Sequence, residues 1–209
     1  MFVQVVRGVV RDPEETFARL DLWLHDLAPA ARGWLGTTAG VTRDGELVSF
    51  VRFASAADAR HNSDRMEQGQ WWVESARVFA GDVSFDNYDG VTVFGDGGSD
   101  DAVRVEVLLG RVPRRRDLTG LAAQLAEEGL APGAQAIGGM VGLHEDGLTQ
   151  AVYYHQPNHC PDAHLVKPVS SVARSLGLAD LRLLHLERLW FGSPSGAVRQ
   201  PGHHRITVP

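Results

Sequence analysis

The second half of this chain repeats landmarks of the first half at a nearly constant offset. A strand glycine, a glycine before a turn and the turn itself recur 102 residues later, as Gly8 and Gly110, Gly40 and Gly142, and Asp44-Gly45 and Asp146-Gly147. Later landmarks such as Ala76-Arg77 and Ala173-Arg174 are 97 residues apart, which indicates a small deletion. A repeat of this length predicts two similar units that pack against each other.

Each unit is expected to follow the order β-α-β-β-α-β. In the first half the predicted strands are 2–10, 34–42, 46–54 and 83–94, because these runs are apolar and β-branched. Asp12-Pro13 predicts the start of the first helix, since Asp caps and Pro suits the first helical position. A second helical region begins near Ser55 and is interrupted near Asn62-Ser63-Asp64.

This order gives a four-stranded antiparallel sheet with both helices on one face. The bare face needs a cover, and a second copy provides it, so the two sheets are expected to face each other around a cavity. The predicted fold class is α+β, with two ferredoxin-like halves. We expect the first half at 1–95, a Gly- and Asp-rich linker at 96–101, the second half at 102–191 and a C-terminal extension at 192–209.

Composition excludes several classes of function. The net charge of −6 is unfavourable for general nucleic-acid binding, which needs a basic face. The apolar runs are shorter than the roughly 20 residues that span a bilayer, so no membrane partner is expected. Cys160 is the only cysteine, which rules out an internal disulfide and favours the cytoplasm.

Three segments resemble a known family: Gly40-Val41-Thr42-Arg43-Asp44-Gly45, the run 50–59, and the stretch from His61-Asn62-Ser63 to Trp71-Trp72. They are similar to the dimeric α/β-barrel superfamily, which includes antibiotic-biosynthesis monooxygenase domains, here in a tandem two-copy form. The resemblance implies an intramolecular dimeric α/β barrel and oxygenation without a cofactor. The implied partner is a small aromatic or polyketide-like ligand, and the chain could be a monomer or a homodimer.

The resemblance also implies a set of site residues in the first half. Asn62 is expected to bind a substrate oxygen, Arg52 to stabilise the substrate anion, and Trp71 or Trp72 to stack on its ring, with His61 beside them. A purely structural alternative is open: residues 62–64 end one helix and cap the next, and both tryptophans fill the core. Strand alternation groups Arg52 with Val48 and Phe50, either facing the cavity or paired at the sheet rim.

The second half carries a different group of polar residues within a short stretch. They are Tyr153, Tyr154, His155, His159, Cys160, Asp162, His164 and Lys167. Its density of imidazole and thiol groups is typical of metal sites, but prolines interrupt it and its spacing fits no zinc signature, so no metal is predicted. The offset of 102 places His164 opposite Asn62, where it could act as a general base. Tyr154 is a candidate substrate contact.

Two classes of function remain open from the sequence. The chain is either a small enzyme acting on an aromatic metabolite or a non-catalytic ligand-binding or stress-related protein. An open cavity lined by polar and aromatic residues favours the enzyme, whereas two sheets meshed by Val, Leu and Phe favour the non-catalytic protein.

Overall fold

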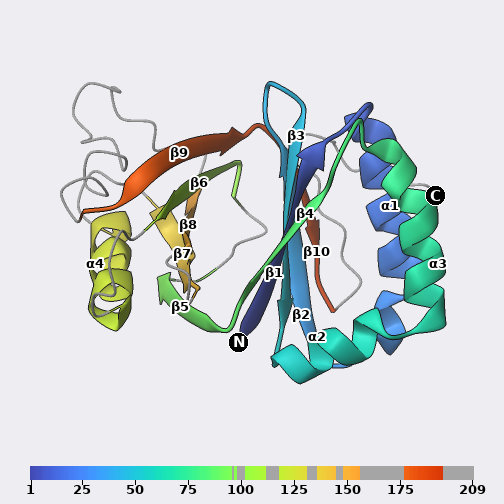
Figure 1. The fold of residues 1–209 in the computed structure, drawn as a ribbon, viewed down its shortest axis with the longest axis horizontal. Coiled ribbons are helices and arrows are strands. Elements are labelled where there is room, and N and C mark those ends of the chain that lie inside the picture. The colour runs from blue at the N-terminus through green and yellow to red at the C-terminus, as the bar shows by residue number, and fades with distance from the viewer. Residues whose placement is uncertain are drawn as a thin grey trace, which may run out of the picture.

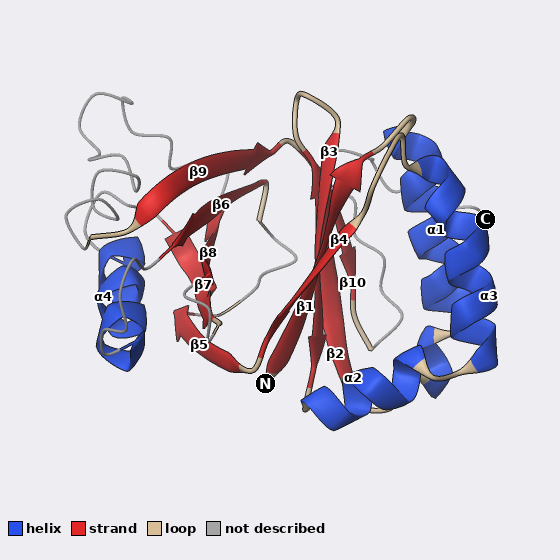
Figure 2. Ribbon diagram, in the orientation of Figure 1, coloured by secondary structure: helices blue, strands red, loops and turns tan. Residues whose placement is uncertain are grey.

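A computed structural model describes residues 1–95, 97, 102–111, 118–130, 136–144, 148–155 and 177–194. Two five-stranded antiparallel sheets face each other at the centre of the molecule. Helices α1, α2 and α3 cover the outer face of the first sheet, and helix α4 lies outside the second (Figures 1 and 2). None of the described helices is long and apolar enough to cross a membrane.

The first half contains β1 (Phe2–Val9), α1 (Pro13–Asp26), η1 (Ala28–Ala30), β2 (Trp34–Val41), β3 (Glu46–Phe53), α2 (Ala56–Ser63), α3 (Met66–Ser75), η2 (Ala76–Val78), β4 (Ser84–Tyr88) and β5 (Gly90–Gly95). The described elements of the second half are β6 (Arg104–Arg111), α4 (Leu118–Leu130), β7 (Ala136–Leu143), β8 (Leu148–His155), β9 (Ala179–Leu186) and β10 (Arg188–Gly192).

Local signals set the helix boundaries in the first half. The carboxylate of Asp12 accepts hydrogen bonds from the amides of Glu14 and Glu15, and Pro13 opens α1. The Ser55 hydroxyl caps α2 by accepting from the Asp58 amide. The predicted interruption of the second helical region lies between α2 and α3, at residues 64 and 65.

The strands of the two halves repeat in the structure as they do in the sequence. Strands β6, β7 and β8 begin and end 102 residues after β1, β2 and β3. Both second strands have an irregularity in register at the same place, between Trp34 and Gly36 and between Ala136 and Gly138. The tandem ferredoxin-like fold class is thereby confirmed over the described residues.

The last strand of each half crosses from its own sheet into the other one. The sequence predicted a single strand at 83–94, but β4 pairs with β1 in the first sheet, whereas β5 pairs with β7 in the second. Likewise β9 pairs with β6, and β10 pairs with β2. Each sheet therefore has five strands rather than four, and each half supplies an edge strand to the other.

Glycines make room for these crossings. A Cβ at Gly40 would lie 2.8 Å from the Leu186 Cβ and 3.0 Å from the Arg188 carbonyl oxygen. A Cβ at Gly142 would lie 2.9 Å from the Tyr88 ring. Such distances are too short for any side chain. Gly40 and Gly142 therefore mark the places where the chain of one half crosses the sheet of the other.

The space between the sheets is packed over the described residues. Val3, Val5, Val48 and Phe50 from the first sheet meet Val105, Val107, Leu184 and Leu186 from the second, all buried in one apolar cluster. The cavity expected between the sheets is therefore not found there, and this packing meets the criterion stated above for the non-catalytic protein. A cavity lies instead on the opposite face of the first sheet.

Candidate functional site

A cavity of about 110 Å³ lies between the first sheet and its helices. We call it the inner cavity. Its floor comes from the helix-facing side of the strands: Gln4, Val6, Thr37, Leu47, Ser49, Val51, Phe53, Phe85 and Trp190. Its roof comes from α1, α2, α3 and η2: Thr16, Arg19, Leu20, Trp23, Asn62, Ser63, Gln68, Trp71, Trp72, Ser75, Val78 and Phe79. An apolar cavity of about 150 Å³ in another protein binds benzene, so this space suits roughly one ring.

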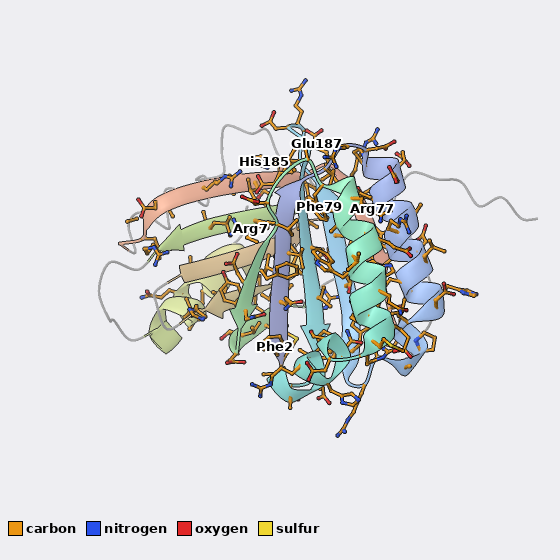
Figure 3. All side chains as sticks on the ribbon, turned by 45° about the vertical axis from the view of Figure 1, so that its right-hand side comes forward. Phe2, Arg7, Arg77, Phe79, His185 and Glu187 are labelled. Atoms are coloured by element: carbon orange, nitrogen blue, oxygen red, sulfur yellow. The ribbon has the colours of Figure 1, made fainter. Side chains whose placement is uncertain are left out.

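Aromatic rings form most of one wall. The Trp72 ring contacts Phe85 edge-on at 5.0 Å between centroids and lies 6.1 Å from Phe79. Trp71 lies 6.2 Å from Trp72, and its indole N–H donates to the Arg19 carbonyl oxygen at 3.2 Å. Figure 3 shows Phe79 between the sheet and α3. Both tryptophans of the pair border the cavity, which gives a flat ligand two rings to stack on.

Asn62 belongs to a hydrogen-bonded group at the junction of α2 and α3. It is buried, donates from Nδ2 to Gln68 Oε1 at 3.3 Å, and accepts from Arg65 at 3.1 Å. The same Gln68 oxygen accepts from the Trp23 indole at 2.7 Å. Asn62 therefore borders the cavity and, through its bonds to Gln68 and Arg65, also links α2 to α3.

Two serine hydroxyls in the cavity lining lack a protein partner. Ser49 and Ser75 are each 3% exposed, and neither Oγ has a hydrogen-bond partner among the described residues. Ser49 lies on the sheet floor between Val48 and Phe50, and Ser75 ends α3 in the roof. Buried hydroxyls are nearly always bonded, so these two residues of the cavity lining are candidate contacts for a ligand. Sequence reasoning missed both. The signal for Ser49 is a single small polar residue inside an apolar strand.

Among the described residues, the second half contributes one residue to the wall of the inner cavity. Trp190 comes from the exchanged strand β10, is fully buried, and donates its indole N–H to Asp21 of α1 at 2.7 Å. This contact could not be predicted from the sequence, because Trp190 is more than 100 residues from every other described residue of the lining. The inner cavity is thus a composite of both halves.

Arg52 lies on the other side of the sheet from Asn62. It shares the sheet-facing side with Val48 and Phe50, as alternation predicted, and donates to the Thr38 hydroxyl at 2.9 Å. Its guanidinium passes over Gly36, whose φ of 131° and lack of a side chain permit the contact. The structure therefore brings Asn62, Trp71 and Trp72 together but does not bring Arg52 to them.

The remaining predicted residues lie elsewhere. His61 is exposed on α2 and does not border the inner cavity. Tyr154 occupies β8 of the second sheet, with its backbone opposite Val105 and Gly138. His164, together with His159, Cys160, Asp162 and Lys167, lies outside the described residues, as does the segment after position 194.

A second, wider cavity adjoins the first. This outer cavity has a volume of about 240 Å³ and is lined by Phe2, Gln4, Ala56, Ala59, Arg60, Ser63, Asn87 and Asp89. Gln4 and Ser63 border both cavities, and Gln4 donates to the Asn87 side-chain oxygen at 3.1 Å. Phe2, at the α2 end of β1, is labelled in Figure 3. The two cavities therefore follow one another along β1.

Comparison with solved structures finds the same architecture in other proteins. A protein from Lactobacillus acidophilus NCFM, provisionally named a monooxygenase, has a TM-score of 0.65 and 13% identity, over 96% of this chain and 96% of its own. A protein of the same provisional name from Fusobacterium nucleatum subsp. nucleatum has a TM-score of 0.64 and 11% identity, over 97% of this chain and 95% of its own. This chain has the dimeric α/β-barrel fold. The resemblance inferred from the sequence is confirmed at the level of the fold.

A third protein with this barrel, described as anthrone oxidase-like, has a TM-score of 0.60 and 10% identity over 100% of this chain and 96% of its own. No protein-family model and no curated protein matches the chain in sequence. At such identities the likeness establishes the barrel architecture alone. The chemistry of this barrel has to be argued from its own residues.

Proposed function

We propose that the protein binds a small phenolic aromatic molecule in the inner cavity and oxygenates it with dioxygen, without a cofactor. The observation that carries this proposal is the pair of buried, unpartnered hydroxyls, Ser49 and Ser75, in a cavity with aromatic walls. A phenol or its anion offers a ring for Trp71 and Trp72 and an oxygen for these hydroxyls. The monooxygenase-like neighbours share the fold and are compatible with this chemistry.

The lining limits which substrates can react. Among the lining residues that the structure describes, Arg19 is the only ionisable side chain, so the cavity offers neither a carboxylate nor an imidazole as a base. The substrate must therefore be acidic enough to lose its proton readily. Ser49 and Ser75 can donate to the resulting oxyanion, and their fixed positions in an enclosed site make such donation effective.

The proposed reaction balances without a further reductant. An activated CH₂ group in the substrate loses both hydrogens and becomes a carbonyl. Dioxygen supplies the carbonyl oxygen, and its second oxygen leaves as water with the two hydrogens. The electrons come from the substrate anion, so the protein's task is to bind the anion, orient its ring and exclude water.

We also propose a cytoplasmic location for the protein, inferred from its lone cysteine.

The test uses binding and turnover together. We expect 2-naphthol to bind the purified protein in isothermal titration calorimetry, with one ring in the inner cavity and the other toward the adjoining outer one. We also expect anthrone, whose three rings need both cavities and which the name of one neighbour suggests, to be converted to the quinone with one dioxygen consumed per molecule, followed by an oxygen electrode and by absorbance. Ser49→Ala should weaken both activities. Binding without oxygen uptake above the protein-free rate would instead support the non-catalytic, ligand-binding alternative.

A further inference from the structure

We infer that the ligand extends from the inner cavity into the outer one and carries an anionic group at its far end, which Arg60 binds. This inference rests on the proposed function, because it places the phenolic ring in the inner cavity. It adds a second subsite and a substrate class, namely hydroxylated aromatic acids with more than one ring.

The continuity of the two cavities supports an extended ligand. Gln4 and Ser63 border both spaces, and the inner one alone has room for about one ring. The Ser63 hydroxyl donates to the Ala59 carbonyl oxygen at 3.0 Å, which turns it back onto its own helix. Gln4 is held by Asn87 at the β4 side. A flat molecule that leaves the inner cavity between Gln4 and Ser63 therefore enters the outer one.

The outer cavity differs chemically from the inner one. Its described lining includes two charged residues, Arg60 and Asp89, whereas the described lining of the inner cavity is mostly apolar and has Arg19 as its one charged residue. Arg60 lies on α2 and is exposed, and among the described residues no carboxylate lies within ion-pair distance of its guanidinium. Asp58, two residues earlier on the same helix, pairs with Arg32 at 3.2 Å rather than with Arg60. Arg60 is thus an exposed cation that lines a ligand-sized cavity and has no carboxylate partner among the described residues, and carboxylate is the group that a guanidinium binds best.

Asp89 is the other charged residue in the described lining of the outer cavity. It lies between β4 and β5, where the chain crosses from the first sheet to the second. Its negative charge opposes a bound carboxylate, so Arg60 and Asp89 should affect an anionic ligand in opposite directions. Because both side chains are exposed, each effect should be a few-fold rather than hundreds-fold.

The experiment compares two ligands that differ only in the anionic group, 2-naphthol and 6-hydroxy-2-naphthoate, by calorimetry at low salt. We expect naphthoate to bind more tightly by about threefold to fivefold, and this preference to decrease as salt is added. Arg60→Gln should remove the preference for naphthoate over naphthol, whereas Asp89→Asn should increase it. Arg43→Gln is the matched control. It removes the same charge from an exposed arginine in the β2–β3 turn, at the other end of β1 from Phe2, and it should change nothing.

The outcomes separate this inference from the function on which it rests. Naphthol binding without a preference for naphthoate overturns the subsite and leaves the proposed function standing. Equal losses in Arg60→Gln and Arg43→Gln also overturn it, because the effect would then come from net charge. If neither ligand binds the wild-type protein, the inner site and the subsite both fall.

Discussion

Replacing Ser49 by alanine should stabilise the protein while weakening its binding of phenols. The buried Ser49 hydroxyl has no hydrogen-bond partner among the described residues, and leaving such a group unsatisfied costs about 1–3 kcal/mol. Alanine keeps the Cβ and removes only the oxygen, so little packing is lost. We expect the free energy of unfolding to rise by about 1 kcal/mol, which raises the Tm of a chain of this size by about 2–4 °C.

The matched control is Ser55→Ala. The Ser55 hydroxyl has partners, since it accepts from the Asp58 amide at 3.1 Å and donates to the Asp58 carboxylate at 2.6 Å. Loss of such a cap costs about 1 kcal/mol, so Tm should fall by as much as it rises in Ser49→Ala. Urea denaturation and thermal unfolding measure both changes.

Binding provides the other half of the test. If the Ser49 hydroxyl donates to the ligand, Ser49→Ala should weaken 2-naphthol binding by about tenfold, or roughly 1.4 kcal/mol. Ser55→Ala should leave the affinity unchanged. The reasoning is refuted if Ser49→Ala lowers stability as Ser55→Ala does, because the hydroxyl would then be making a bond that stabilises the fold. Unchanged affinity in a stabilised variant would remove Ser49 from the ligand site.

Further variants test the crossing and the walls of the cavity. Gly40→Ala should lower the free energy of unfolding by about 1–3 kcal/mol, because the added Cβ overpacks against Leu186. Gly69→Ala in α3 should raise it by about 0.5–1 kcal/mol, because a Cβ there meets nothing within 4 Å. Urea denaturation measures both changes. Trp190→Phe removes the bond to Asp21 and part of the wall, and should cost about 2 kcal/mol and weaken 2-naphthol binding in calorimetry. Asn62→Ala should cost about 1–2 kcal/mol, because it breaks the bonds to Gln68 and Arg65; an unchanged Tm would argue against its structural role. Arg52→Ala should leave 2-naphthol affinity as in the wild type, because Arg52 lies on the opposite face of the sheet; a large loss would place the ligand between the sheets.

The strands and the repeat could be predicted because their signals are local. Apolar, β-branched runs predicted β1, β2 and β3 to within one residue of their ends, and Gly40 and Asp44-Gly45 set the offset that the second half follows. The exchange of strands could not be predicted. Residues 83–94 read as one continuous strand, and nothing local says that the chain changes sheets at Asp89.

The site was predictable only in part for a related reason. Both faces of the first sheet are buried, so alternation separates Ser49 from Phe50 but does not say which face borders a cavity. The pattern 61–72 pointed to Asn62, Trp71 and Trp72, which do border one cavity. Trp190 and Ser75 reach it only through tertiary packing, and that packing depends on the crossing of β10.

Because β10 crosses into the first sheet, that sheet cannot be completed during synthesis until the second half has been translated. Strand β2 is an interior strand of the first sheet, yet its partner β10 is translated about 150 residues later. Until then β2 is an exposed edge, open to pairing with another nascent chain. The first half cannot seal its cavity with Trp190 before the second half has emerged from the ribosome. Residues 188–192 of the second half are therefore part of the first half's cavity, and either half made alone would have an unpaired strand until it met the other.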